Sequence, residues 1–316
     1  MKPGQPSQHY IGIISTTGAY FLWGFLPIYW KLLDSVPSLQ VLAHRVVWSF
    51  IFMLLVLLVA GKLKLFRAEL AQTFSSPRQL VILFLASLAV SINWLTFIWA
   101  VANDRIIETS LGYYINPLVS VLLGMLVLKE KLSPWQTLSF FLALIGVLNM
   151  TLSFGSFPWI ALLLAVSFGF YGLLKKLINL TAAAGITAET LMITPMALIY
   201  LTYAHKLGYG AFSFGSPGLS FFLAGSGVIT AIPLLLFSAG AKRLPLSAVG
   251  FLQYIAPSIA LILGIYLYHE PFTTVHLISF ALIWTALAIY SLSRTRTFIQ
   301  LESLLLKKLP IKSPGA

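Results

Sequence analysis

The sequence predicts an all-α integral membrane protein with ten transmembrane helices that form two inverted five-helix repeats. Three observations support this prediction. First, 59% of the 316 residues are hydrophobic and only 9% are charged, whereas about a quarter of the residues in a soluble domain are charged. Second, apolar runs long enough to cross a bilayer recur along the chain. Third, a stretch in the first half of the sequence returns in the second half.

The predicted spans each contain roughly 20 mostly apolar residues, the length at which an α-helix crosses a hydrocarbon core of ~30 Å. In chain order they are residues 10–30, 39–60, 79–101, 106–128, 134–153, 158–178, 186–206, 218–240, 246–268 and 272–292. The first follows "MKPGQPSQH" and lacks the short apolar region and small-residue cleavage site of a signal peptide, so we expect a retained helix. The loops between the spans are short, which leaves no room for a soluble domain with its own core.

The repeated stretch reads "YINPLVSVLLGMLVLKE" at residues 114–130 and "YIAPSIALILGIYLYHE" at residues 254–270. The copies lie 140 residues apart and share Tyr-Ile, Pro, Leu-Gly and Glu in one register. This offset carries the fourth span onto the ninth, and a shift of five helices inverts the orientation in the membrane. Earlier in the halves the offset becomes about 145 and pairs "WGFLPIYWK" with "FGFYGLLKK". The predicted repeats are residues 10–153 and 158–292, followed by a basic tail at 293–316.

The chain has a net charge of +12, and the positions of its Lys and Arg residues indicate how it is oriented in the membrane. Of the 20 Lys and Arg residues, 16 fall in segments on the same side as the two termini, among them Lys175 and Lys176. Loops rich in Lys and Arg mark the cytoplasmic side, so both termini are predicted to be cytoplasmic. We expect the basic surface to attract anionic membrane lipid rather than nucleic acid. In the C-terminal tail, the near-helical spacing of Phe298, Leu301, Leu305 and Leu309 predicts a helix that lies on the membrane surface. A disordered tail is the alternative.

The inverted arrangement, the element "INPLVSVLLGMLVLKEKLSPWQ" and the opening "TTGAYFLWGFLPIYWK" resemble the drug/metabolite transporter superfamily, EamA type, and most closely the RarD proteins of bacterial inner membranes. The resemblance covers nearly the whole chain. It implies two EamA repeats in a multi-pass inner-membrane permease for a small organic solute, such as an amino acid, a metabolite or an amphipathic drug. It favours export or exchange over uptake. Inverted repeats in secondary transporters also imply alternating access, with the solute site near the midplane between the halves.

Two other function classes remain open on the sequence. The first is a polytopic membrane enzyme that acts on lipid or isoprenoid substrates. Such an enzyme is expected to carry aspartate-rich, histidine-rich or nucleophilic clusters at the membrane edge, and only the mixed turn at 104–108 approaches one. The second is a scaffold without transport activity. Polar side chains at mid-depth argue against a scaffold, because they are costly in a bilayer.

Those mid-depth polar side chains are candidates for the solute pathway. The candidate amides are Asn93, Asn116 and Gln253. The aromatic side chains at comparable depth, which suit a flat or amphipathic solute, are Trp23, Trp94, Tyr113, Tyr114, Tyr171 and Tyr254. The alternative is that the amides bond between helices and that the rings face lipid or pack in the core.

Pro117 and Pro257 are predicted hinges. A proline within a helix removes one backbone hydrogen bond and displaces the carbonyl four residues earlier, here those of Tyr113 and Gln253. An ordinary kink is the alternative. Small residues follow at four-residue spacing and predict close helix packing; they are Ser120, Gly124, Ala260 and Gly264.

The charged candidates for coupling or gating are His44, Arg45 and Glu189. Arg45 lies about two turns inside the second span and therefore needs a partner or must extend outward. Glu189 has two interpretations. If Thr187 caps its helix, the glutamate is a favourable first-turn anion at the cytoplasmic surface, which is the preferred interpretation. If the helix begins near Ala183, Glu189 is embedded and can carry a coupling proton.

Several kinds of chemistry are not expected. The sequence contains neither a G-x-x-x-x-G-K-[ST] motif for ATP nor any cysteine. The histidines are scattered over different helices, so no metal site is predicted, and no nucleophile–base set points to a catalytic residue. No cofactor is expected. The expected partners are a small-molecule solute and membrane lipid. Because both repeats lie on one chain, a monomer is sufficient, and the sequence leaves a dimer open.

Overall fold

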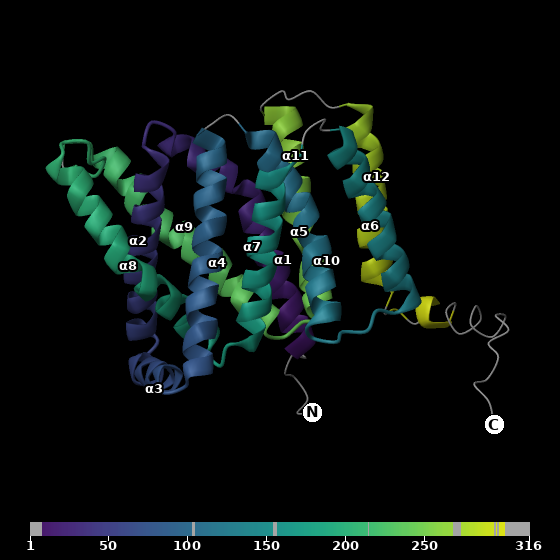
Figure 1. The fold of residues 1–316 in the computed structure, drawn as a ribbon, viewed down its shortest axis with the longest axis horizontal. Coiled ribbons are helices and arrows are strands. Elements are labelled where there is room, and N and C mark those ends of the chain that lie inside the picture. Colours follow the sequence, from purple (N-terminus) through teal and green to yellow (C-terminus); the bar gives the residue numbers. More distant parts are fainter. Residues whose placement is uncertain are drawn as a thin grey trace.

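The computed structural model describes residues 8–102, 105–153, 157–213, 215–267, 273–293, 295 and 297–300. Their regular structure is helical (Figure 1). In chain order the helices are α1 (Gln8–Trp30), the 3₁₀ helix η1 (Lys31–Leu33), α2 (Ser38–Val59), α3 (Leu63–Phe74), α4 (Pro77–Ala102), α5 (Ile106–Leu126), α6 (Pro134–Ser153), α7 (Trp159–Leu177), α8 (Ala182–Lys206), α9 (Pro217–Ala241), α10 (Leu246–Gln253), α11 (Ile255–Leu267) and α12 (Thr274–Leu292).

Within the described residues, eight helices are long and apolar enough to cross a membrane. They are α1, α2, α4, α6, α7, α8, α9 and α12. Two shorter apolar segments, Leu111–Leu126 and Leu246–Ile259, lie in the fourth and ninth predicted spans. The helical architecture and the apolar helices are those of an integral membrane protein.

The sequence pattern does not predict the helix α3, because residues 61–78 lie between two apolar runs and are expected to form a loop with Lys and Arg residues. It has 12 residues, fewer than a membrane span needs, and buries Phe66 and Thr73 while leaving most other side chains at least partly exposed. Glu69 on α3 accepts hydrogen bonds from the backbone N–H (2.9 Å) and the hydroxyl (3.1 Å) of Thr181, which precedes α8. A search for apolar runs misses such a short amphipathic helix.

The ninth predicted span is not one continuous helix. Helix α10 ends at Gln253, α11 begins at Ile255, and Tyr254 lies at the break. Pro257 follows in the first turn of α11, where it has no N–H to donate to the carbonyl of Gln253. In contrast, α5 continues through Pro117 without interruption. The two repeated prolines therefore have different effects on the backbone.

The helices pack in a recurring set of pairs. Helix α5 packs on α7 and α10, α1 packs on α9 and α11, and α4 packs on α7 and α8. Helix α2 packs on α8 and α9, and α6 packs on α12 at one end of the molecule (Figure 1). The neighbours α5 and α10–α11 run antiparallel, because Tyr114 near the start of α5 contacts Pro257 in α11, whereas Glu130 beyond the end of α5 contacts Leu246 at the start of α10.

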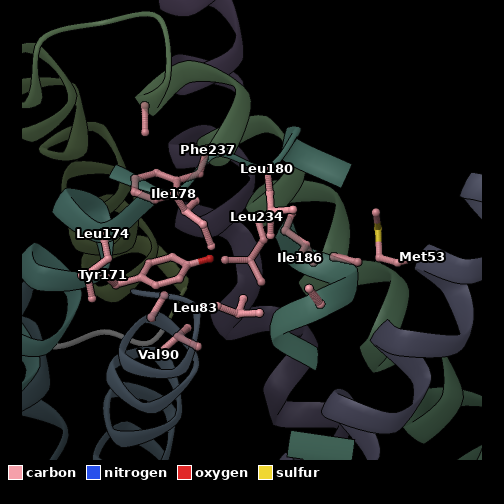
Figure 2. Close-up of a cluster of buried hydrophobic side chains, with 14 of the residues drawn as sticks. Met53, Leu83, Val90, Tyr171, Leu174, Ile178, Leu180, Ile186, Leu234 and Phe237 are labelled. Atoms are coloured by element: carbon pink, nitrogen blue, oxygen red, sulfur yellow. The ribbon is translucent and has the colours of Figure 1, made fainter. Parts of the chain in front are cut away.

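Two apolar clusters form most of the core. The larger cluster joins α1, α2, α3, α4, α7, α8, α9 and α10, and the second joins α5, α6, α10 and α12. Figure 2 shows the Tyr171 ring of α7 among Leu83 of α4, Leu234 of α9 and Ile178, with Phe237 of α9 beside it. The site residues are thus held in a packed interior.

Helices α2 and α9 approach closely at Gly227. A Cβ atom added there would lie 2.3 Å from the carbonyl carbon of Trp48 and 2.5 Å from the backbone nitrogen of Ser49. The Ser49 hydroxyl donates a hydrogen bond of 3.0 Å to the Gly227 carbonyl. Only a residue without a side chain permits this backbone contact between the two helices.

Candidate functional site

The two predicted asparagines bond between helices. The Asn93 side-chain amide on α4 donates to the carbonyl of Leu164 (3.0 Å) and to the hydroxyl of Ser167 (3.1 Å). The Asn116 amide on α5 donates to the carbonyl of Ala165 at 2.8 Å. All three acceptors belong to α7, so these amides fix α7 between α4 and α5. Their part in a solute pathway stays a prediction.

The Gln253 side chain is buried at the end of α10, where its amide oxygen accepts a hydrogen bond of 3.4 Å from the Tyr20 hydroxyl on α1. Trp23, one turn further along α1, packs against Phe168 and Phe237 with ring centroids 5.5 and 5.6 Å apart. These contacts join α1 to α7, α9 and α10. The polar and aromatic candidates of this region therefore form part of the interior packing between the two halves of the chain.

Tyr114 and Tyr254 lie on either side of the contact between α5 and the broken helix. The Tyr114 hydroxyl donates to the carbonyl of Pro257 at 3.0 Å, and its ring meets Phe280 of α12 edge-on. Tyr254 is fully buried at the break, and its hydroxyl has no hydrogen-bond partner among the described residues. The break between α10 and α11 is thus held by a side chain of α5.

The small residues of α5 contact α10 and the loop after α5. A Cβ atom added to Gly250 would lie 2.9 Å from the Ser120 Cβ and 2.8 Å from the Pro117 carbonyl oxygen. A Cβ atom added to Gly124 would lie 2.8 Å from a carboxylate oxygen of Glu130. Ala260 and Gly264 belong to α11, and the packing of their side-chain positions lies outside the described residues.

The Glu130 carboxylate caps α10. It accepts hydrogen bonds from the backbone N–H groups of Leu246 (2.5 Å) and Ser247 (3.0 Å) and from the Ser247 hydroxyl (2.8 Å). A carboxylate at a helix N-terminus satisfies N–H groups that lack an intrahelical partner and is favoured by the helix dipole. Its repeat counterpart, Glu270, lies outside the described residues.

Arg45 is enclosed by aromatic rings. Its side chain on α2 is only 6% exposed. The guanidinium carbon lies 4.4 Å from the centre of the Trp30 ring and 4.8 Å from that of Trp94, and Nε donates to the Thr230 hydroxyl at 3.0 Å. Cation–π contacts offset part of the cost of removing the charge from water.

Tyr113 of α5 packs on Phe97, with ring centroids 5.9 Å apart.

His44 lines a pocket of about 390 Å³ at the end of α8. Its ring stacks on Phe212, and its Nε2 atom is buried without a partner among the described residues. Gln40, also at this pocket, holds the loop after α8 by bonds to Tyr209 and Ala211. The pocket lies between α2 and this loop.

The preferred interpretation of Glu189 is wrong. Helix α8 begins at Ala182 after the N-cap residue Thr181, so Thr187 lies inside the helix and does not cap it. Glu189 is in the second turn and is 3% exposed. The interpretation in which the helix starts near Ala183 and embeds Glu189 matches this position. Its role as a proton carrier stays a prediction.

Glu189 forms a buried ion pair that joins α7 to α8. Lys175 Nζ lies 2.7 Å from one carboxylate oxygen, and the Tyr171 hydroxyl donates to the other at 3.0 Å. The sequence counts Lys175, near the end of the predicted span 158–178, among the cations on the side of the two termini, and its side chain is 0% exposed. Burial, together with the charge of Lys175, lowers the pKa of Lys242, just beyond α9, to about 8.

The repeat relates the Lys175–Glu189 pair to two positions in the first half. The offset of 145 residues pairs Trp30 with Lys175 and His44 with Glu189. Because those counterparts are a tryptophan and a histidine, the repeat does not by itself predict the ion pair. Among the described residues, no group of three His, Asp or Glu side chains is arranged to hold a metal ion.

Comparisons with known proteins agree on one kind of protein. The EamA-like transporter family model matches residues 10–152. The chain is 48% identical to "Uncharacterized transporter YojE" of Bacillus subtilis, over 90% of this chain and 95% of that protein. It is 43% identical to "Protein RarD" of Salmonella typhimurium, over 88% and 94%, and 40% identical to "Protein RarD" of Escherichia coli, over 88% and 93%. A solved structure described only as "Crystal structure of protein" matches with a TM-score of 0.67 at 19% identity, over 91% of this chain and 99% of the other, and shows the fold alone.

Proposed function

Because this chain belongs to the EamA-like transporter family and is related to the RarD proteins, we propose that it is a secondary transporter that moves a small organic solute by alternating access between two inverted halves. The halves are residues 10–153 and 158–292, and both termini face the cytoplasm from the bacterial inner membrane. The solute is an amino acid, a metabolite or an amphipathic drug, and it is exported or exchanged. The family and the names of the relatives point to a transporter rather than an enzyme.

The observation that carries this proposal is the symmetry of the helix contacts. The repeat pairs α1 with α7, α2 with α8, α4 with α9, α5 with α10–α11, and α6 with α12. Under this exchange the contact α4–α7 becomes α9–α1, α5–α7 becomes α11–α1, and α2–α9 becomes α8–α4. The contacts α5–α10, α6–α12 and α2–α8 map onto themselves. This pattern supports a two-fold axis in the membrane plane, and such an axis would make two states of similar energy available.

Glu130 supplies a contact that alternating access has to break. It belongs to the first half and caps α10 of the second half. On the proposed orientation this contact joins the halves at the cytoplasmic side. Opening the solute pathway to the cytoplasm then separates the Glu130 carboxylate from the N-terminus of α10.

Replacing Glu130 with alanine is expected to favour the state that is open to the cytoplasm. Losing a helix cap costs about 1 kcal/mol, which changes the ratio of two states about fivefold. The chain has no cysteine, so spin labels can be attached to Lys131→Cys and Arg243→Cys, one in each half. In double electron–electron resonance, the Glu130→Ala variant should show more of the longer distances. Asp34→Ala, which removes an exposed carboxylate elsewhere, is the matched control. Equal distance distributions in the two variants would contradict a closing role for Glu130.

Solute flux in proteoliposomes tests the transporter itself. A thermal-shift screen of the purified protein against amino acids, nucleosides, S-adenosylmethionine and aromatic antibiotics selects the compounds to load, because a ligand of the folded state stabilises it. Selected compounds should exchange across vesicles that contain the protein and not across protein-free vesicles. Chemical conversion without flux would favour the membrane enzyme, and neither flux nor conversion would favour a scaffold.

A further inference from the structure

We propose that Arg45 binds a carboxylate of the transported solute. This inference rests on the proposed function and names the chemical class of its solute: small organic acids, including amino acids. It starts from the position of one charge. Arg45 is a cation that is 6% exposed in the outer half of α2. Charged groups within a membrane-spanning helix are costly and mark solute or ion pathways unless the protein neutralises them.

The protein neutralises Arg45 only in part. Trp30 and Trp94 offer their ring faces, and Thr230 accepts from Nε at 3.0 Å. Among the residues that the structure describes, no carboxylate lies within ion-pair distance of the guanidinium. The two rings, the Thr230 hydroxyl and the nearby Tyr113 are neutral groups, so the positive charge has no counter-ion among the described residues.

The unused donors of Arg45 form the end of the guanidinium that suits a carboxylate. A guanidinium has five N–H donors, and the recorded bond engages Nε alone. Within the described part of the chain, neither terminal nitrogen has a recorded protein acceptor. Among the described residues, the side-chain atoms that are fully buried and have no hydrogen-bond partner are Thr16 Oγ1, His44 Nε2, Ser238 Oγ and Tyr254 Oη. The terminal nitrogens of Arg45 do not belong to this group. The two nitrogens therefore keep accessible surface and can form the paired hydrogen bonds that a carboxylate accepts.

The second half of the chain shows how a buried cation is paired when its role is internal. There Lys175 lies 2.7 Å from Glu189. The 145-residue offset places Trp30 at the position of Lys175 and His44 at that of Glu189. In the first half the cation is carried by Arg45, and His44 stacks on Phe212 instead of offering an anion. At these pseudo-symmetric positions the first half therefore carries neither the lysine nor the glutamate. Its buried cation, Arg45, has no carboxylate partner among the described residues.

The surroundings of Arg45 favour a carboxylate over a phosphate. A phosphate monoester carries a charge of about −1.5 to −2 at neutral pH, whereas Arg45 carries a single positive charge and the side chains recorded against its guanidinium, Trp30, Trp94 and Thr230, carry none. The flanking rings of Trp30 and Trp94 present apolar area to the body of the solute. One positive charge between apolar walls matches an anion with one negative charge on an organic skeleton.

The test compares acids with their amides, which differ in the carboxylate and little in shape. The probes are acetate and acetamide, 3-phenylpropionate and 3-phenylpropanamide, and L-phenylalanine and L-phenylalaninamide. Binding to the purified wild-type protein is measured by thermal shift, and flux is measured in proteoliposomes. At least one acid should bind about tenfold or more tightly than its amide, the loss expected when a hydrogen-bonded ion pair becomes a neutral contact. This comparison needs no variant, so a folding defect cannot affect it.

Variants then assign the preference to Arg45. Arg45→Gln should lower the acid-to-amide ratio to about one, and Arg45→Lys should retain part of it because the charge remains and the paired donors are lost. Arg67→Gln, which removes an exposed arginine on α3, should keep the wild-type ratio. If no acid exceeds its amide, or if a folded Arg45→Gln protein keeps the full preference, the carboxylate site is wrong. Equal flux of acid and amide would overturn the site and leave the transporter intact, whereas acid binding without any flux would overturn the transporter and leave the site intact.

Discussion

Replacing Gly227 with alanine is expected to destabilise the protein by about 3 kcal/mol or more, the upper end of what an added methyl group costs in a packed interior. The added Cβ would lie 2.3 Å from the carbonyl carbon of Trp48 and 2.5 Å from the nitrogen of Ser49. Both atoms belong to the backbone of α2, which cannot rotate away as a side chain can. Relief requires that α2 and α9 separate, which also lengthens the bond from Ser49 to the Gly227 carbonyl.

The measurement is thermal unfolding of the purified protein in detergent, together with the monodisperse yield from size-exclusion chromatography. Gly218→Ala on the same helix is the matched control, because no atom lies within 4 Å of the added Cβ. The Gly218 variant should unfold near the wild-type temperature. Close agreement between the two variants would show that α2 and α9 do not touch through Gly227.

Removing either partner of the Lys175–Glu189 ion pair should cost about 3–5 kcal/mol, because it leaves the other charge buried without compensation. The side chains are 0% and 4% exposed, so solvent screens the pair little. The comparison uses Lys175→Met, Glu189→Gln and the double variant. Glutamine keeps an acceptor for the Tyr171 hydroxyl. The double variant should be more stable than the sum of the single effects predicts, by about 2 kcal/mol.

The coupling energy follows from the unfolding temperatures of the wild-type protein, the two single variants and the double variant. The control is Lys64→Met, which removes an exposed lysine and measures the effect of losing a solvated charge. Additive single effects would contradict a buried ion pair. The same variants address the coupling role predicted for Glu189. If Glu189→Gln transports at the wild-type rate with the wild-type pH dependence, Glu189 does not carry a coupling proton.

The order of the helices could be predicted because it depends on local composition. Eight of the ten predicted spans correspond to long apolar helices, since hydropathy is summed over neighbouring residues. The short helix α3 and the break at Tyr254 could not be found in this way. The first is amphipathic and too short for a span, and the second lies within an unbroken apolar run whose proline has a counterpart, Pro117, in a continuous helix.

The candidate residues could be selected by depth, but their partners could not. Asn93 and Asn116 are recognised as costly mid-depth polar groups, yet nothing local shows that both bond to α7. The burial of Lys175 could not be predicted for a similar reason. Its burial depends on Glu189, which lies 14 residues away on the next helix.

Hydropathy, charge placement and the repeated motif are written along the chain, and they establish a membrane protein of the EamA type. The neutralisation of each buried charge depends instead on helices that are distant in sequence. Lys175 meets a carboxylate of α8, whereas Arg45 meets the rings of Trp30 and Trp94 and the hydroxyl of Thr230 on α9. Electrostatic and hydrogen-bond energies fall steeply with distance. The packing of the helices therefore settles which buried cation meets a carboxylate and which, among the described residues, meets only rings and a hydroxyl.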